Sequence, residues 1–306
     1  MARVEERLDT GLVASPPADD AARPRTRGDL ARMPWVSVVI ITVMVLGALA
    51  APLIAPHSPT EQSLPEKLLP PAWEAGGGRN HLLGTDVLGR DVLSRLLWGA
   101  RISLSIALAA TILGAVVGST VGLVAGYYRG LADGALTKLI DVQLGFPFVL
   151  LAISVIAVAG PGIGVLVVVL AVGSWVGHAR IVRGLALSLR ERDYVHAARA
   201  VGAGNARILL RHLLPEVLSV ILILATFDVG RIIILESTLS FLGLGVQPPT
   251  PSWGSDLRDA AIYIRRAWWT AAFPGLAIMV VVLGVNLLGD ALRDAFDPRT
   301  VASRSS

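Results

Sequence analysis

The sequence predicts an all-α polytopic membrane protein with six transmembrane helices. Of its 306 residues, 54% are hydrophobic and only 16% are charged, whereas a soluble domain carries about a quarter charged residues. The mean hydropathy is +0.65. The apolar residues also form uncharged runs of the length, about 20 residues, that a helix needs to cross a bilayer. These three observations place the chain in a membrane.

Composition excludes several other classes. The chain has no cysteine, so disulfide scaffolds, cysteine zinc sites and thiol catalysis are excluded. Its net charge of +4 is too small for a nucleic-acid partner. The two lysines, Lys67 and Lys138, follow Glu66 and Thr137, so a Gly-Lys-Ser/Thr phosphate loop is absent. We therefore expect no ATP hydrolysis on this chain.

The first span follows a polar N-terminal segment. Residues 1–33 hold six arginines among acidic residues, Pro and Gly, and we expect a disordered cytoplasmic tail there. The first uncharged run extends from Met33 to Thr60. It starts too far from the N-terminus for a secretory signal, so we expect a membrane anchor. Residues 34–100 then comprise the first transmembrane helix and an outer loop.

Five further spans are expected within residues 101–292. The second lies between Arg101 and Arg129, with a glycine every fourth residue that allows close helix packing. The run from Val142 to Ala179 is too long for one span, and its Gly160-Pro161-Gly162 break divides it into the third and fourth. The fifth extends from Pro215 to about Phe241, and the sixth lies between Arg266 and Asp290.

Basic residues favour one orientation. With the N-terminus inside, the inner segments hold 18 Lys and Arg and the outer segments hold 8. Cytoplasmic loops carry the excess of positive charge. We therefore expect both termini in the cytoplasm, including a short C-terminal tail at 293–306.

An amphipathic stretch precedes the second span on the outer side. Thr85 or Asp86 can cap a helix, and Asp91 and Arg95 are spaced to form an i, i+4 ion pair. One face of this helix would hold Leu88, Val92, Leu96 and Gly99. We expect an interfacial helix that frames the entrance, with direct contact to an extracellular binding protein as the alternative.

The cytoplasmic loop 182–216 is predicted to form two short helices. Asp193 suits the N-cap of the first helix, Asn205 suits that of the second, and Gly202 and Pro215 suit their ends. The apolar face of the first helix follows an i, i+3, i+4, i+7 pattern at Tyr194, Ala197, Ala198 and Val201. A helix resting on the membrane surface and a docking element for a partner both fit this pattern.

This loop resembles the EAA loop of permeases in binding-protein-dependent ABC importers. That motif is Glu-Ala-Ala, three residues, Gly, nine residues, an apolar residue, any residue and Leu-Pro. At these spacings the chain has His196-Ala197-Ala198, Gly202, His212 and Leu214-Pro215.

The resemblance implies that the segment with Tyr194, His196, Ala197, Ala198, Arg199, Gly202 and Pro215 couples the chain to an ATPase subunit. His196 replaces the usual Glu and His212 replaces the apolar residue. A neutral His cannot form the salt bridge of a Glu at pH 7.

Four further blocks extend the resemblance to residues 35–298: His81–Leu104, Leu139–Pro147, Ala179–Gly184 and Glu236–Gly254. They are similar to the dipeptide, oligopeptide and nickel branch, and more narrowly to its C-type subunit. This implies the type I ABC importer permease fold. It also implies a second homologous permease, two cytoplasmic ATPases and an extracellular solute-binding protein as partners. ATP and magnesium would bind the ATPases, and we expect no cofactor or metal on this chain.

Four ionisable residues are candidates for the translocation path: Asp141, Asp228, Arg231 and Glu236. Charged groups within a span usually face a partner or a water-filled path. Asp228 and Arg231 are three residues apart and can pair. The pair could meet a zwitterionic peptide or join the second permease. Asp141 is expected to open the third span, where a negative charge suits the helix dipole, with a substrate or proton role as the alternative.

Taken together, these resemblances imply the permease subunit of an ATP-driven importer of di- or oligopeptides. A nickel-chelate or glutathione-type importer is the alternative within the class. A proton-coupled secondary transporter would use Asp141, Asp228 and Glu236 as relays, but it leaves the cytoplasmic loop unexplained. The five histidines have no i, i+4 spacing among themselves, which argues against a metal site and a metal-dependent intramembrane enzyme.

Overall fold

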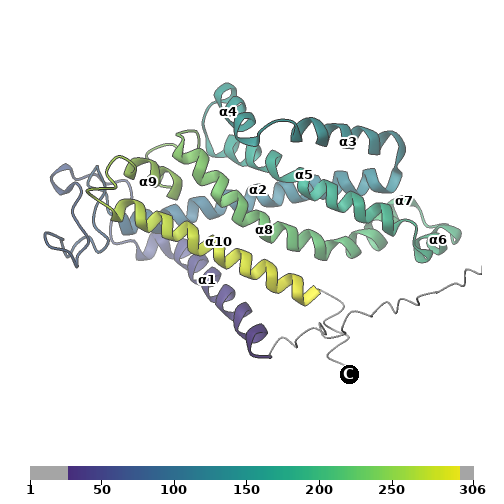
Figure 1. The fold of residues 1–306 in the computed structure, drawn as a ribbon, viewed down its shortest axis with the longest axis horizontal. Helices are drawn as coiled ribbons and strands as arrows, with labels where there is room; N and C mark the ends of the chain where they lie inside the picture. Colours follow the sequence, from purple (N-terminus) through teal and green to yellow (C-terminus); the bar gives the residue numbers. More distant parts are fainter. Residues whose placement is uncertain (1–26, 297–306) are drawn as a thin grey trace, which may run out of the picture.

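The protein is an elongated bundle of helices in a computed structural model that describes residues 27–296, with side chains from residue 35 (Figure 1). The helices are α1 (Arg27–Ile54), the 3-10 turn η1 (Leu64–Glu66), α2 (Val92–Tyr128), α3 (Gly130–Leu144), α4 (Phe148–Ala159), α5 (Ile163–Leu189), α6 (Asp193–Ala200), α7 (Asn205–Ile208), the π-helical turn η2 (Leu209–Leu213), α8 (Leu214–Phe241), α9 (Trp253–Ala260) and α10 (Trp269–Phe296).

The described helices support the predicted membrane architecture. Five are long and apolar enough to cross a membrane, and the bent pair of α3 and α4 makes a sixth span if it is counted as one. The break at Gly160–Gly162 lies where the sequence predicts it, between α4 and α5. The all-helical prediction is therefore confirmed, with five or six candidate spans.

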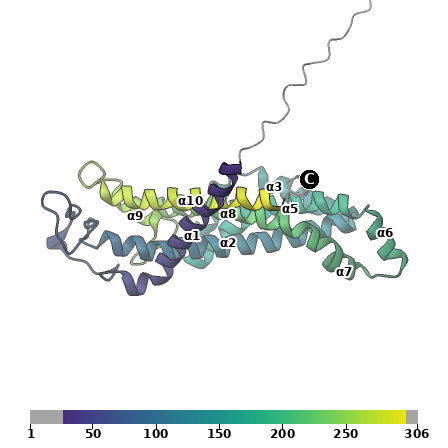
Figure 2. The ribbon, with the colours of Figure 1, turned by 90° about the horizontal axis from the view of Figure 1, so that it is seen from below.

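The two ends of the bundle differ in structure (Figures 1 and 2). We call one the α6 end; it carries α6 and α7, and the start of α1 and the end of α10 lie toward it. We call the other the α9 end; it carries α9 and the α1–α2 loop, residues 55–91. Helix α1 begins at Arg27, earlier than expected. Helix α10 continues to Phe296, into the segment expected to be the C-terminal tail. The rest of both expected tails lies outside the described residues.

Helix α2 is longer than expected because it absorbs the predicted interfacial helix. It begins at Val92, and the Asp91 carboxylate caps it by accepting the backbone N–H of Ser94 at 2.8 Å. Residues 85–91 form a turn instead, in which Asp86 accepts the N–H groups of Leu88 and Arg90. At 1.5 Å per residue, a helix of 37 residues is about 56 Å long. The separate interfacial helix predicted from the sequence is wrong.

The third span is broken rather than continuous. Helices α3 and α4 meet at 90°, with Gly145, Phe146 and Pro147 between them. Proline disfavours the helical conformation of the residue before it, which explains the break at this position. Helix α4 has 12 residues and is about 18 Å long, too short to cross about 30 Å of hydrocarbon alone. The predicted uninterrupted third span is wrong.

The glycines of α2 let α5 pack closely against it, as the sequence predicts. A Cβ added to any of the four would collide with side-chain or backbone atoms of α5. At Gly118 and Gly122 those atoms include the backbone of Trp175 and Ala179. The four glycines are Gly114, Gly118, Gly122 and Gly126. This close contact forms the centre of the bundle.

Pro215 does not end a helix, contrary to expectation. The chain stays helical from Asn205 to Phe241, and the π-helical turn η2 lies directly before the proline. In this wider turn the N–H of Leu214 donates to the carbonyl of Leu209, five residues earlier. A regular α-helix would bring the proline ring against a carbonyl. Helices α7 and α8 therefore form one continuous helical segment.

Candidate coupling and translocation site

Helix α6 is anchored to the bundle by one face and exposed on the other. Val195 and Ala198 are buried in a cluster with Ile208 and Leu213. Of the four residues on the predicted apolar face, Ala198 joins this cluster. The other three are exposed, Val201 at 85%. We call these three residues, Tyr194, Ala197 and Val201, the α6 strip.

The turn after α6 depends on Gly202. Its φ of +83° lies in the left-handed region, which favours glycine, and its N–H donates to the carbonyl of Arg199 at 2.9 Å. The predicted helix end is confirmed. The two predicted N-caps are each wrong by one residue, because Arg192 and Gly204 hold those positions.

Tyr127 at the end of α2 holds the α6 segment in place, a role that the residue pattern alone did not predict. Its hydroxyl donates to Asn205 Oδ1 at 2.8 Å, and its carbonyl accepts from Arg190 Nη1 at 2.5 Å. The Arg199 guanidinium lies 5.3 Å from the ring centroid, within cation–π range. The Tyr127-Tyr128 pair at the end of a span is typical of a membrane interface. This pattern was the feature of the sequence that could have indicated a role for Tyr127.

The two residues that depart from the EAA motif lie at the surface of this segment. The His196 side chain is 53% exposed, and its Nε2 lies 3.9 Å from Glu191 Oε2. The imidazole of His212 stacks on the ring of Tyr194, with centroids 6.4 Å apart. His196 is thus open to a partner molecule, while His212 supports one residue of the α6 strip.

The predicted pair of Asp228 and Arg231 forms on α8. Arg231 Nε donates to Asp228 Oδ1 at 2.9 Å, and its Nη2 donates to the carbonyl of Gly173 at 3.2 Å. The second carboxylate oxygen accepts from Ser174 Oγ at 2.5 Å and lies 3.4 Å from His178 Nδ1. The carboxylate therefore joins α8 to α5. Arg231 is half exposed and Asp228 is 15% exposed, so the arginine reaches the bundle surface.

The other two path candidates lie apart from this pair, with no ion pair to it among the described residues. Glu236 is fully buried and accepts a hydrogen bond from Ser240 Oγ at 2.8 Å. Asp141 is exposed and lies in the last turn of α3. The expectation that it opens a span and suits the N-terminal dipole is wrong, because its charge lies near a helix C-terminus.

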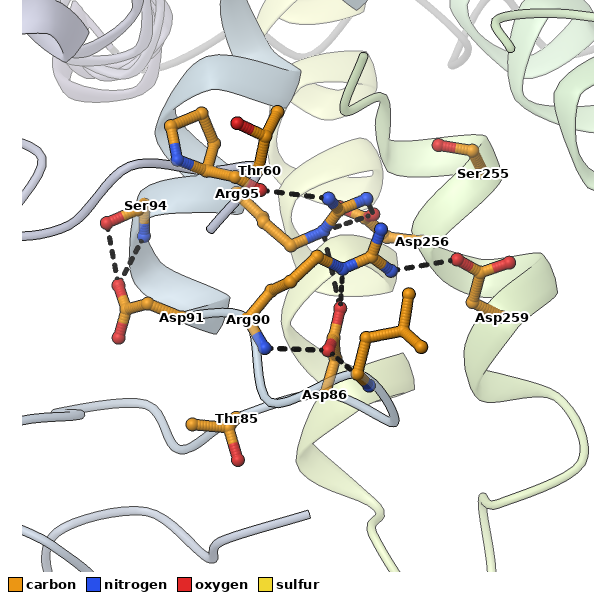
Figure 3. Close-up of polar contacts among 12 residues, drawn as sticks. Thr60, Thr85, Asp86, Arg90, Asp91, Ser94, Arg95, Ser255, Asp256 and Asp259 are labelled. Carbon is orange, nitrogen blue, oxygen red and sulfur yellow. Dashed lines mark hydrogen bonds and ion pairs between the residues drawn. The ribbon is translucent and has the colours of Figure 1, made fainter. Parts of the chain in front are cut away.

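A buried ion network closes the α9 end (Figure 3). Arg95 pairs with Asp256 and lies 3.6 Å from Asp86. Arg90 donates to Asp86 at 2.5 Å and to Asp259 at 3.0 Å. The predicted pair of Asp91 and Arg95 is wrong, because Asp91 turns to Ser94 and Arg95 turns to α9. The network thus fixes the start of α2 to α9.

Burial and charge act together on the groups of this network. Burial raises the pKa of the Asp256 carboxyl above its ordinary value, although attraction from Arg95 opposes the rise. Burial alone would lower the pKa of Arg90, but attraction and a hydrogen bond from Asp86 raise it above its ordinary value. Helix α9 presents Asp256 because a reciprocal capping box of Ser252 and Ser255 starts it there.

Comparisons with known proteins agree with this architecture. Residues 118–302 match the family described as binding-protein-dependent transport system inner membrane component, and residues 32–71 match the N-terminal transmembrane domain of oligopeptide transport permease C. The chain is 42% identical to the di/tripeptide transport system permease protein DppC of Pseudomonas aeruginosa over 86% of both chains. It is 43% identical to the dipeptide transport system permease protein DppC of Escherichia coli K12, over 86% of this chain and 88% of that one.

A solved structure supports the fold alone. In inward-facing crystals of the MetNI methionine ABC transporter, one chain aligns with a TM-score of 0.53 and 20% identity, covering 66% of this chain and 97% of that chain. The family matches and the curated relatives define the bundle as an ABC importer permease, a transmembrane subunit without catalysis of its own. The chain belongs to the family of binding-protein-dependent transport system inner membrane components, and within it to the OppC/DppC type. Membership implies a binding protein and ATPases on other chains, and a multi-pass location in the inner membrane.

Proposed function

We propose that the chain forms half of the pore of an ATP-driven importer for di- or oligopeptides. A second homologous permease would form the other half. Two cytoplasmic ATPases would bind at the α6 end, and an extracellular or periplasmic solute-binding protein would dock at the α9 end. The observation that carries this proposal is the α6 strip, an exposed face on a helix whose buried residues Val195 and Ala198 fix it to the bundle.

The α6 segment has the properties that transmission of force requires. Val195 and Ala198 are packed in the bundle and Tyr127 holds the segment by its side chain and carbonyl. Movement of a partner bound to the α6 strip would therefore be transmitted to the bundle, because the strip is not part of a flexible loop. Small side chains such as Ala197 let a helix approach a groove closely, which is the helix-in-groove mode of recognition. His196, Arg199 and Gly202 complete the proposed coupling surface, and Pro215 lies in the first turn of α8.

The orientation rests on charge. The excess of Lys and Arg, 18 against 8, falls in segments that share a side with the N-terminus, and positive charge is retained in the cytoplasm. This charge distribution favours a cytoplasmic location for both termini and for the α6 end. It leaves the α9 end, with its ion network, facing the solute-binding protein.

The proposed cargo rests on the relatives and on the pair of opposite charges. The two curated relatives are named for di/tripeptides and dipeptides. Asp228 and the half-exposed Arg231 offer an acceptor and a cation side by side, which suits the two charged termini of a short peptide. Nickel chelates and glutathione remain alternative cargoes of the same permease type, and competition in uptake would distinguish them.

The coupling role is tested by replacing Gly202 with valine. At φ +83° a β-branched residue is strained, so the end of α6 must move while the bundle core is untouched. We expect membrane levels near normal, peptide uptake in reconstituted vesicles reduced at least about tenfold, and ATP hydrolysis no longer stimulated by peptide and binding protein.

The matched control is Gly204→Val. Gly204 has φ −69° and ψ 155°, a conformation that valine favours, and a Cβ there meets nothing within 4 Å. This variant should retain uptake. Normal uptake by Gly202→Val would contradict the coupling role, and uptake that survives ATP depletion but collapses with the proton gradient would favour the secondary transporter.

A double-mutant cycle tests whether Asp228 and Arg231 act as a pair in the translocation path. Asp228→Asn leaves Arg231 without its partner, whereas the double variant with Arg231→Gln removes both charges. We expect the double variant to transport somewhat better than Asp228→Asn, with a coupling of less than about 1 kcal/mol because Arg231 is half exposed. Strictly additive losses would show that the pair does not act as a unit in transport.

A further inference from the structure

Two histidines and an aspartate that are far apart in the α1–α2 loop converge at the start of α2. The side-chain ligand atoms of His57, His81 and Asp91 all lie within 4.8 Å of one another. We propose that these three residues, the His57–His81–Asp91 cluster, bind a divalent first-row transition metal of the Zn²⁺ type. Residue spacing could not predict the site, because the loop alone brings the ligands together.

Asp91 is held in the orientation that a metal ligand requires. Its Oδ2 accepts from the backbone N–H and the hydroxyl of Ser94 at 2.8 and 2.7 Å. Its Oδ1 faces the imidazoles, 2.9 Å from His81 Nδ1 and 3.8 Å from His57 Nδ1. Ligands about 2.0–2.1 Å from a tetrahedral ion lie about 3.3 Å apart. The two separations from Asp91 bracket that value, and all three ligand atoms lie within 4.8 Å of one another, so side-chain adjustments would close the site around an ion.

His57 has an unused ligand atom. Its Nδ1 is buried and has no hydrogen-bond partner among the described residues, which is costly for a polar group. Its backbone N–H donates to Ser94 Oγ at 3.1 Å, so the hydroxyl that orients Asp91 also positions His57. A cation between His57 and Asp91 would satisfy the orphaned nitrogen and the buried carboxylate together.

The cluster opens into a polar cavity that can complete a coordination sphere. The cavity has a volume of about 110 Å³ and is lined by His57, His81 and Asp91 with Glu61, Glu66 and Asn80 among others. One water occupies about 30 Å³, so an ion and bound water fit. Glu66 Oε2 lies 3.6 Å from His81 Nε2, where it can orient a ring that ligates through Nδ1. Two imidazoles and one carboxylate suit Zn²⁺, and also Co²⁺ and Ni²⁺.

The proposed ion would join the α1–α2 loop to α2. His57 lies just after α1, His81 lies in the middle of the loop, and Asp91 caps α2. A metal that binds only the folded loop stabilises it by its binding free energy. The proposed metal site does not depend on the peptide cargo or on the coupling role, so it can be tested separately from them.

The test uses full-length permease purified in detergent with an affinity tag that contains no histidine. After chelator treatment, the protein is titrated with Zn²⁺, and bound metal and thermal stability are measured. We expect one ion per chain and a rise of Tm with zinc. His57→Gln and Asp91→Asn should each weaken binding at least about tenfold and remove the rise. Asparagine retains the oxygen that caps α2, so Asp91→Asn separates the metal site from the cap.

The matched control is His212→Gln, which removes a histidine at the α6 end and should bind zinc as the unmodified chain does. Co²⁺ provides a second readout on the unmodified chain, because nitrogen and oxygen ligands in a low-symmetry site give visible d–d absorption. Failure to retain an equivalent of metal, absence of that absorption, or equal binding by Asp91→Asn would each overturn the proposal.

Discussion

The two ends of the bundle use charge in opposite ways. At the α9 end, Arg90 and Arg95 are at most 5% exposed and are paired with carboxylates of the loop and of α9. At the α6 end, the ion pair of Arg129 and Glu191 is about half exposed on both sides, and apolar Val201 faces outward. The α9 end is completed by the chain itself. The α6 end leaves a surface for another molecule to complete.

This difference follows from where the buried groups can find partners. A buried ion is tolerated only when it is paired and hydrogen-bonded, so the α9 end needs all of its carboxylates in place. The α6 end needs only two apolar anchors and the contacts of Tyr127, because its charges remain hydrated. Substitutions at the α9 end should therefore lower the stability of the protein. Substitutions at the α6 end should instead weaken the coupling between the ATPases and the bundle.

The largest expected effect comes from removing one buried charge. Arg95→Met leaves Asp256 buried without its main partner, and breaking such a pair costs about 3–5 kcal/mol. The matched change at the other end, Arg129→Met, should cost less than about 1 kcal/mol because its pair is exposed. Thermal or denaturant unfolding of the two purified variants measures the difference. Equal unfolding midpoints for the two variants would contradict the proposed difference in charge burial between the two ends.

The pH dependence of Arg95→Met sharpens the same comparison. Burial already raises the pKa of Asp256, and removal of Arg95 removes the attraction that opposes the rise. A carboxyl with a raised pKa contributes stability below its unfolded pKa, and that stability is lost as the pH rises through its folded pKa. The variant should therefore be closest to the parent protein at acidic pH, with a deficit that grows as the pH rises. A deficit independent of pH would exclude Asp256 as its source.

A smaller effect is expected at the tether of α6. Tyr127→Phe removes the hydroxyl that donates to Asn205 but keeps the ring beneath Arg199, so it should cost about 1 kcal/mol. Amide exchange of residues 193–208 should accelerate while the rest of the bundle is unchanged. Tyr128→Phe is the control, because Tyr128 is 52% exposed and does not contact Asn205. Similar exchange in both variants would show that Tyr127 is no tether.

The smallest effect is expected from restoring the Glu of the EAA motif. His196 is half exposed, and surface substitutions usually change stability by less than about 0.5 kcal/mol. His196→Glu should therefore leave the unfolding midpoint unchanged. If the ATPase makes the usual contact, uptake should be retained or improved. A strong loss of uptake would show that the ATPase of this system has adapted to histidine.

Long-range periodicity predicted more of this structure than local capping rules did. The glycines of α2 and the break at Gly160–Gly162 were predictable, because helix packing and chain direction depend on spacing alone. The bend before Phe148 and the continuous helix through Pro215 were not. In both cases a proline has two outcomes, a break or an adjusted turn, and the neighbouring helices determine which one forms.

The contacts at the two ends show where sequence reasoning stops. Asp228 and Arg231 share one helix, so their pair follows from spacing. Arg95 instead pairs with Asp256, 161 residues away, and His57 lies against Asp91 across a loop. Such partners depend on how loops fold back over helix ends, which hydrophobic patterning does not encode. The α6 strip is intermediate: its helix was predictable, but which residues turn outward depends on the position of Tyr127.

The continuity of α7, η2 and α8 makes this part of the molecule a lever. Asn205 and Asp228 are 23 residues apart on one continuous helical segment, a length of about 35 Å along the helix at 1.5 Å per residue. A tilt of about 5° about one end would displace the other by about 3 Å, the length of a hydrogen bond. Because no loop interrupts the helical segment, most of that displacement would reach the pair of Asp228 and Arg231.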